Sequence, residues 1–82
     1  MNNIVGVKLQ VIGSIDNIAK SAIHVAALLK APVTFSFNGV TIHISEYCDW
    51  RDVADSAMIA VRNGTKEIWI KEYRGVNNVY IY

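Results

Sequence analysis

Apolar and polar residues alternate along four segments of the chain, and this period of two is typical of half-buried β-strands. The four segments are residues 4–12, 33–45, 65–73 and 79–82. The second segment is long enough for two strands and contains Asn38-Gly39 at its centre, the pair preferred in a type I′ turn. We therefore expect this segment to form a two-stranded hairpin.

The two-residue turn also fixes which residues of the hairpin face each other. It pairs Phe37 with Val40, Phe35 with Ile42 and Val33 with Ile44. All six are apolar, so one face of the hairpin is predicted to belong to the core. The opposite face carries small polar residues and one histidine, namely Thr34, Ser36, Thr41, His43 and Ser45.

Between the strands, apolar residues recur every three or four positions, which is the spacing of an amphipathic helix. This spacing predicts one helix over residues 14–30 and a second over 49–63. Ser14 or Asp16 can cap the first helix and Asp49 the second, because their oxygens accept hydrogen bonds from free backbone N–H groups. The expected buried stripe of the second helix consists of Trp50, Val53, Ala54, Ala57, Met58 and Val61.

The predicted order of elements is β-α-β-β-α-β-β, and residues 1–82 are expected to form a single α+β domain. Two helices packed on one face of a mainly antiparallel sheet would cover its apolar side. The first four strands and the two helices follow the order of a ferredoxin-like, split βαβ arrangement. The fifth strand is expected to extend this sheet or to form a hairpin with the fourth.

Composition and charge narrow the class of protein. Of the 82 residues 52% are hydrophobic, which is enough for a packed core and argues against disorder. The net charge of +1 lacks the basic excess of a dedicated DNA or RNA binder. Cys48 is the only cysteine, so no internal disulfide forms, and a lone thiol suits a reducing compartment. With no signal-peptide pattern at Met1-Asn2-Asn3 and no apolar run of ~20 residues, we expect a cytoplasmic protein that does not enter membranes.

The reactive side chains are few and form no recognisable catalytic or metal-binding motif. A Cys–His nucleophile pair needs hydrogen-bond contact, yet His43 is predicted on a polar strand face and Cys48 just before the second helix. That position would lower the pKa of the Cys48 thiol; the other interpretation is that Cys48 packs against Val53 as a hydrophobic staple. His24 adds too few ligands for zinc, and no glycine-rich phosphate loop is present. We therefore expect no enzyme activity, no metal and no cofactor.

Among the predicted surfaces, the outward face of the last two strands has the residue types most typical of a binding site. Its aromatic and basic residues form the candidate partner-binding set, namely Trp69, Lys71, Tyr73, Arg74, Tyr80 and Tyr82. A second candidate surface is the polar face of the hairpin, with Thr34, Ser36, Thr41 and His43. Exposed Trp, Tyr and Arg side chains form hot spots in protein interfaces, and exposed aromatics also stack on single-stranded bases. A third interpretation is that the chain's own elements, or a second copy, cover this face.

The charge balance favours a protein partner over nucleic acid. Residues 62–82 carry four basic and two acidic side chains, a smaller cationic excess than phosphate binding usually uses. We therefore expect a non-enzymatic protein-binding module. The alternative is a small regulatory domain that binds single-stranded nucleic acid or a nucleotide. The final strand also offers an edge at which a second copy can pair, so a homodimer is compatible with both functions.

One stretch of the sequence resembles a pattern found in small phage-encoded proteins. It runs Lys30-Ala31-Pro32-Val33-Thr34-Phe35-Ser36-Phe37-Asn38-Gly39-Val40-Thr41-Ile42-His43-Ile44 and is followed by the helix that Asp49 caps. The resemblance is to accessory proteins of the anti-CRISPR or anti-defence kind and covers about half of the chain. It implies a phage or prophage protein that binds and blocks a host protein or ribonucleoprotein complex in the bacterial cytoplasm. Such proteins share no common site, so the resemblance transfers no functional residue.

Overall fold

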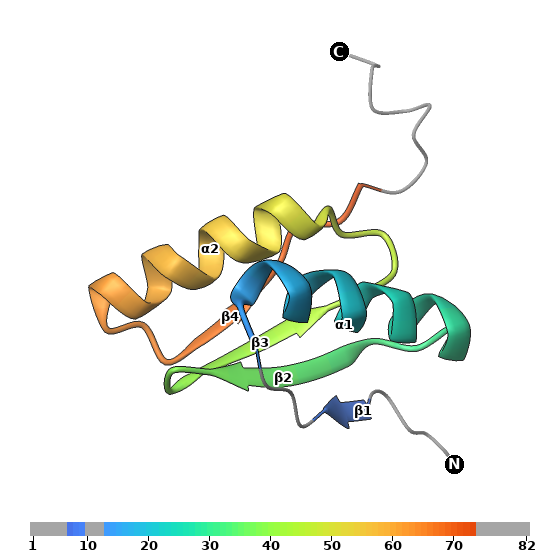
Figure 1. Ribbon diagram of the computed structural model, residues 1–82, viewed down its shortest axis with the longest axis horizontal. Helices are drawn as coiled ribbons and strands as arrows, with labels where there is room; N and C mark the ends of the chain where they lie inside the picture. Colours follow the sequence, from blue (N-terminus) through green and yellow to red (C-terminus); the bar gives the residue numbers. More distant parts are fainter. Residues whose placement is uncertain (1–6, 10–12, 74–82) are drawn as a thin grey trace.

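The computed structural model describes residues 7–9 and 13–73 of the chain (Figure 1). Over this part the chain forms helices and strands of the expected α+β class. In chain order the elements are β1 (Val7–Leu9), α1 (Ile15–Leu29), β2 (Val33–Phe37), β3 (Val40–Ile44), α2 (Trp50–Asn63) and β4 (Glu67–Trp69). Neither of these two helices is long and apolar enough to cross a membrane. The strand expected at residues 79–82 lies outside the described residues.

The described strands form one mixed sheet in the order β1-β2-β3-β4. β1 and β2 are parallel, β2 and β3 are antiparallel, and β3 and β4 are parallel. This arrangement differs from the expected mainly antiparallel sheet of ferredoxin-like order, in which another strand separates the two strands that a helix joins. Here α1 connects the neighbours β1 and β2, and α2 connects the neighbours β3 and β4. Alternation along a strand specifies its two faces but not its neighbours, so the pattern did not contain the strand order.

The hairpin of β2 and β3 has the register expected from its turn. Phe37 faces Val40, Phe35 faces Ile42, and Val33 faces Ile44. Asn38 and Gly39 adopt φ angles of 48° and 83°, both positive as a type I′ turn requires. The hairpin thus forms the centre of the sheet, with apolar side chains on one face and polar side chains on the other.

Both helices lie on the apolar face of the sheet and contact each other as well as the strands (Figure 1). The hydroxyl of Ser14 caps α1 by accepting a hydrogen bond from the N–H of Asn17 at 3.3 Å. The carboxylate of Asp49 caps α2 in the same way, accepting from the N–H of Arg51 at 2.9 Å. Gly64 ends α2 with a φ of 75°, the left-handed conformation that glycine adopts at helix C-termini. Within the described residues, the other face of the sheet carries no helix.

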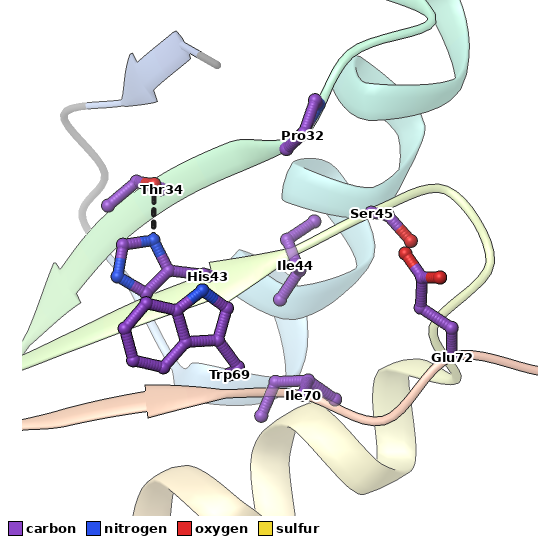
Figure 2. A pocket seen from close by; sticks show the side chains of 8 residues that line it. All are labelled: Pro32, Thr34, His43, Ile44, Ser45, Trp69, Ile70 and Glu72. Atoms are coloured by element: carbon purple, nitrogen blue, oxygen red, sulfur yellow. Dashed lines mark hydrogen bonds between the residues drawn. The ribbon is translucent and has the colours of Figure 1, made fainter. Parts of the chain in front are cut away.

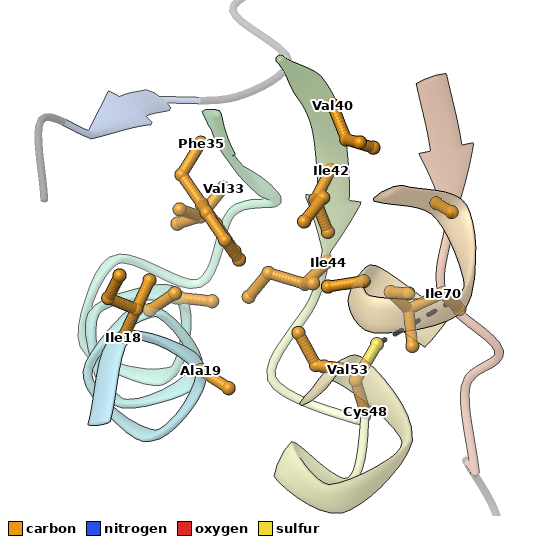
Figure 3. Close-up of a cluster of buried hydrophobic side chains, with 14 residues drawn as sticks. Ile18, Ala19, Val33, Phe35, Val40, Ile42, Ile44, Cys48, Val53 and Ile70 are labelled. Carbon is orange, nitrogen blue, oxygen red and sulfur yellow. Dashed lines mark hydrogen bonds between the residues drawn. The ribbon is translucent and has the colours of Figure 1, made fainter. Parts of the chain in front are cut away.

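The hydrophobic core lies between the helices and the sheet (Figure 3). Its largest fully buried side chains are Phe35, Ile42, Val33, Val40 and Val53. Alanines fill most buried positions of both helices, which lets the helix backbones approach each other and the sheet closely. Met58 is 46% exposed, so its expected place in the buried stripe of α2 is wrong. It follows the buried Ala57 by one residue, and one residue turns a side chain by about 100° around a helix.

Candidate functional site

His43 lies at the centre of the helix-free face of the sheet. It is flanked in β3 by the buried Ile42 and Ile44, so the alternation of the strand turns its side chain away from the core. The strand register places Thr34 of β2 on one side of it and Trp69 of β4 on the other. Strand pairing therefore brings together three side chains from separate parts of the sequence.

Both ring nitrogens of His43 are hydrogen-bonded. Nδ1 lies 2.9 Å from Oγ1 of Thr34 (Figure 2), and Nε2 lies 2.7 Å from Oε2 of Glu67. In one neutral form the Nε2–H donates to Glu67 while the Thr34 hydroxyl donates to Nδ1; in the imidazolium both nitrogens donate. Both forms keep the two bonds, so the orientation of the ring is fixed in either protonation state.

Trp69 stacks on this fixed ring. The ring centroids of His43 and Trp69 are 4.4 Å apart and the planes are inclined by 17° (Figure 2). Trp69 is nevertheless 71% exposed, the largest exposed fraction among the big apolar side chains of the described residues. The imidazole therefore lies against one face of the indole, while solvent surrounds most of the rest of the Trp69 side chain. We refer to Thr34, His43, Glu67 and Trp69 as the His43 cluster.

A hollow of about 470 Å³ lies beside the His43 cluster. It is lined by Thr34, His43 and Trp69 at one end and by Ser45 and Glu72 at the other, as Figure 2 shows. Pro32, Ile44 and Ile70 complete the lining. Among the described residues, the lining therefore has an aromatic end, apolar walls and a carboxylate, but no lysine or arginine.

The order hydroxyl, imidazole, carboxylate is also that of a nucleophile activated by a base and an orienting acid. Acyl-transfer chemistry needs in addition free N–H groups that stabilise an oxyanion. Thr34 lies in β2, which is paired on both sides by β1 and β3, so the sheet ladders take up the backbone N–H groups around it. Among the described residues, moreover, no group of three His, Cys, Asp or Glu side chains is placed to hold a metal ion. This geometry is suited to holding the His43 ring in place.

Cys48 lies on the other side of the sheet, in the core next to Val53, as the hydrophobic-staple interpretation expects (Figure 3). Its sulfur accepts a hydrogen bond from the N–H of Ser45 at 3.3 Å, and the thiol donates to the carbonyl of Ile70 at 3.6 Å. Burial raises the pKa of the Cys48 thiol, and the hydrogen bonds from Ser45 only partly oppose this. The expected lowering by the start of α2 is therefore wrong, and Cys48 cannot pair with His43 across the sheet.

The structure does not place the described residues of the predicted aromatic surface on one face. β4 ends at Trp69, and the chain then turns toward the start of α2, where the N–H of Tyr73 donates to the carbonyl of Tyr47 at 2.8 Å. The Tyr73 hydroxyl donates a hydrogen bond to the carboxylate of Asp52, which raises the pKa of the phenol. Lys71 has its Nζ 5.4 Å from the centre of the Tyr73 ring. The prediction that Trp69 and Tyr73 share one face is therefore wrong, because β4 ends at Trp69 and the alternation of its side chains does not continue as far as Tyr73. The remaining members of that set, Arg74, Tyr80 and Tyr82, lie outside the described residues.

The second candidate surface is placed as the sequence pattern predicts. Thr34 faces His43 and Ser36 faces Thr41 across the hairpin, on the helix-free side of the sheet. Thr34 and His43 are in direct contact. Whether these residues bind a partner stays a prediction.

Glu67 is the functional candidate that the sequence pattern did not single out. It precedes Trp69 by two residues, so period two already puts both on one face of their strand. What the pattern lacked was the parallel pairing of β3 with β4, which sets Thr41 opposite Glu67 and His43 opposite Trp69. With that pairing one member of the first candidate set, Trp69, lies beside the second candidate surface.

Comparison with known proteins supplies no homologue from which a role for the His43 cluster could be transferred. No protein-family model, no curated protein and no solved structure matches the chain.

Proposed function

We propose that this domain is a non-enzymatic protein-binding module that docks through the helix-free face of its sheet, with Trp69 as the anchor. The observation that carries the proposal is that Trp69 is 71% exposed and yet held against a histidine whose two nitrogens are both bonded. Tryptophan is among the residues most enriched in interface hot spots.

Fixing the anchor before binding strengthens binding. Ordering a mobile side chain at an interface costs about 0.5–1.5 kcal/mol, and a side chain that is already ordered avoids much of this cost. In the His43 cluster the contacts that order Trp69 come from the protein itself, through Thr34, Glu67 and His43. A large, rigid and exposed aromatic ring is therefore ready for a complementary pocket.

The partner that we propose is a host protein or ribonucleoprotein complex. The narrower hypothesis is that the domain is a phage-derived inhibitor that blocks a host defence complex in the bacterial cytoplasm. It is supported by the resemblance of residues 30–44, with the helix that follows, to small phage accessory proteins. The proposal that Trp69 anchors a partner on the sheet does not depend on this narrower hypothesis.

The test compares Trp69→Ala with a matched control on the helical side. Leu28 in α1 is 69% exposed, so Leu28→Ala removes a comparably exposed apolar side chain far from the His43 cluster in the fold. Proteins captured from host-cell lysate by the wild-type domain are identified, purified and titrated with each variant. We expect Trp69→Ala to cost about 2 kcal/mol or more of binding free energy, and Leu28→Ala to leave it unchanged. Equal affinity of both variants and the wild type would contradict the proposal.

Self-association is measured in the same experiment. A mass of two chains by light scattering that returns to one chain in Trp69→Ala would show that the face binds a second copy and not a host protein. Circular dichroism and thermal unfolding of both variants confirm that the fold is retained.

A single-stranded nucleic acid is the second candidate ligand, because an exposed indole is also a stacking platform for a base. Titration with an oligothymidylate at low and moderate salt tests it. Binding that is strong at low salt, weakens steeply with salt and disappears in Trp69→Ala would favour nucleic acid over the protein partner.

A further inference from the structure

The two hydrogen bonds of His43 leave its neutral ring a single arrangement. A carboxylate has no hydrogen to donate, so the 2.7 Å contact with Oε2 of Glu67 requires a hydrogen on Nε2 of His43. Nδ1 of the neutral ring then carries a lone pair, and the hydroxyl of Thr34, 2.9 Å away, has to donate to it. Glu67 thus selects one tautomer of His43, and this tautomer directs the hydroxyl hydrogen of Thr34.

This arrangement decides which contact Thr34 offers to a ligand. A threonine hydroxyl has one hydrogen and two lone pairs, and here the hydrogen is used on His43 (Figure 2). Thr34 also lines the hollow beside Trp69, so its oxygen is within reach of a group that binds there. While His43 is neutral, the Thr34 oxygen therefore accepts a hydrogen bond from such a group and donates none.

Protonation of His43 reverses the hydrogen bond to Thr34. In the imidazolium Nδ1–H donates, so the Thr34 oxygen uses a lone pair on the ring and its own hydrogen is released. The ring then carries a positive charge beside Thr34 and Trp69. Histidine is the side chain that most readily changes its charge near neutral pH. The chemistry of Thr34 therefore changes with pH, while the ring keeps both of its hydrogen-bonding partners.

The charged groups near His43 come from two sides of β3. Glu67 of β4 is in direct contact with the ring, and Glu72 lines the same hollow. On the other side, the strand register places Lys8 of β1 opposite Thr34. The helices α1 and α2 lie on the opposite face of the sheet. Protonation of His43 turns its hydrogen bond with Glu67 into an ion pair, so this contact is kept in both states.

We infer that Thr34 is a specificity-determining contact of the docking face, which accepts a hydrogen bond from an N–H or O–H group of the partner while His43 is neutral. Protonation of His43 weakens this contact, because the imidazolium takes one lone pair of Thr34 and its positive charge opposes a second donor. Glu67 is a positioning residue, since it acts on Thr34 through His43. The inference rests on the proposed function, because it names the chemistry of the partner group that binds beside Trp69.

The first test uses the free protein. The ring nitrogens of His43 are followed by NMR of the full chain labelled with ¹⁵N, over a series of pH values. We expect neutral His43 to carry its hydrogen on Nε2 alone, and Glu67→Gln to give a mixture of tautomers, because an amide both donates and accepts. His24, exposed on α1, is the control in the same spectrum, and its tautomers should not respond to Glu67→Gln. A hydrogen on Nδ1 of the neutral wild-type ring, or an unchanged tautomer in Glu67→Gln, would overturn the inference.

The second test uses the captured and purified partner. Thr34→Val keeps the shape of the side chain without its hydroxyl, and Thr34→Ser keeps the hydroxyl. With His43 neutral, we expect Thr34→Val to weaken binding about fivefold and Thr34→Ser to retain it. As the pH falls through the titration of His43, wild-type affinity should fall about fivefold, whereas that of Thr34→Val should change less. Wild-type affinity in Thr34→Val, or tighter wild-type binding in acid, would contradict a donor on Thr34.

The outcomes also separate this inference from the proposed function. If Trp69→Ala abolishes binding of the captured protein and Thr34→Val leaves it unchanged, the contact with Thr34 is wrong and the docking face stands. If Trp69→Ala has no effect, the docking face itself is wrong. The tautomer measurement needs no partner, so it tests the effect of Glu67 on His43 in either case.

Discussion

The indole of Trp69 and the imidazole of His43 are opposite each other on neighbouring parallel strands, with their centroids 4.4 Å apart. Among the described residues, His43 is the aromatic ring that stacks on Trp69. The hydrogen bonds between His43 and its partners Thr34 and Glu67 therefore act on Trp69 indirectly, because they fix the imidazole ring on which Trp69 stacks.

We predict that His43→Ala makes the Trp69 side chain mobile while the fold is retained. The variant loses the stack and both hydrogen bonds of a half-buried ring, at a cost of about 1 kcal/mol in the free energy of unfolding. In a Trp50→Phe background Trp69 is the only tryptophan, and its fluorescence anisotropy reports the motion. The control is Thr41→Ala on the same face of β3. An anisotropy that is the same in both variants would mean that His43 does not hold Trp69.

The second prediction concerns the hydrophobic core. It compares a small truncation of a buried side chain with a larger truncation of an exposed one. Ile42 is fully buried, so Ile42→Val should cost about 1 kcal/mol although it removes a single methylene group. Met58→Ala removes more atoms, yet Met58 is 46% exposed, so it should change the free energy of unfolding by less than about 0.5 kcal/mol. Urea unfolding of the two variants measures both. The reverse order would show that Met58 belongs to the core after all.

The structure also shows which features could be predicted from the sequence pattern. The register of the hairpin followed from Asn38-Gly39, because a two-residue turn leaves only one pairing for the alternating residues on either side. The caps Ser14 and Asp49 followed from local chemistry in the same way. Features that depend on one short stretch of chain were therefore predictable.

The site was only half predictable, because it depends on long-range pairing. The pattern placed His43 and Trp69 on outward faces but on separate surfaces, since alternation does not say that β3 and β4 are parallel neighbours. Because the pairing of β3 with β4 was not predicted, the pattern also did not identify Glu67 as the hydrogen-bond partner of His43. The prediction for Tyr73 was wrong for a different reason. The pattern continued its alternation past the end of β4, whereas the structure places the Tyr73 hydroxyl against the Asp52 carboxylate of α2.

Burial of Cys48 leads to a prediction on the pH dependence of stability. Burial raises the pKa of the thiol above its ordinary value of 9.0, so the folded protein favours the protonated form. The resulting contribution to stability is present below pH 9.0 and is lost as the pH rises through the raised pKa of the folded state. We expect the wild type to lose more stability than Cys48→Ala over this alkaline window, as measured by urea unfolding at a series of pH values. Parallel pH profiles of the two proteins would contradict a buried, protonated thiol.

The contact between Tyr73 and Asp52 gives the last prediction. The Tyr73 phenol donates to the Asp52 carboxylate, and ionisation would both break this bond and place two negative charges side by side, so its pKa lies above the ordinary 10.0. Asp52→Asn removes the neighbouring charge and should lower the Tyr73 pKa, whereas Asp55→Asn should not; NMR titration of the tyrosine ring signals measures both. Because the folded-state pKa is raised, the stabilising effect of the contact is complete below pH 10.0 and disappears as the pH rises through the folded value. Tyr73→Phe should remove this alkaline loss from the stability profile, and an unchanged profile would mean that Tyr73 does not tie the end of β4 to α2.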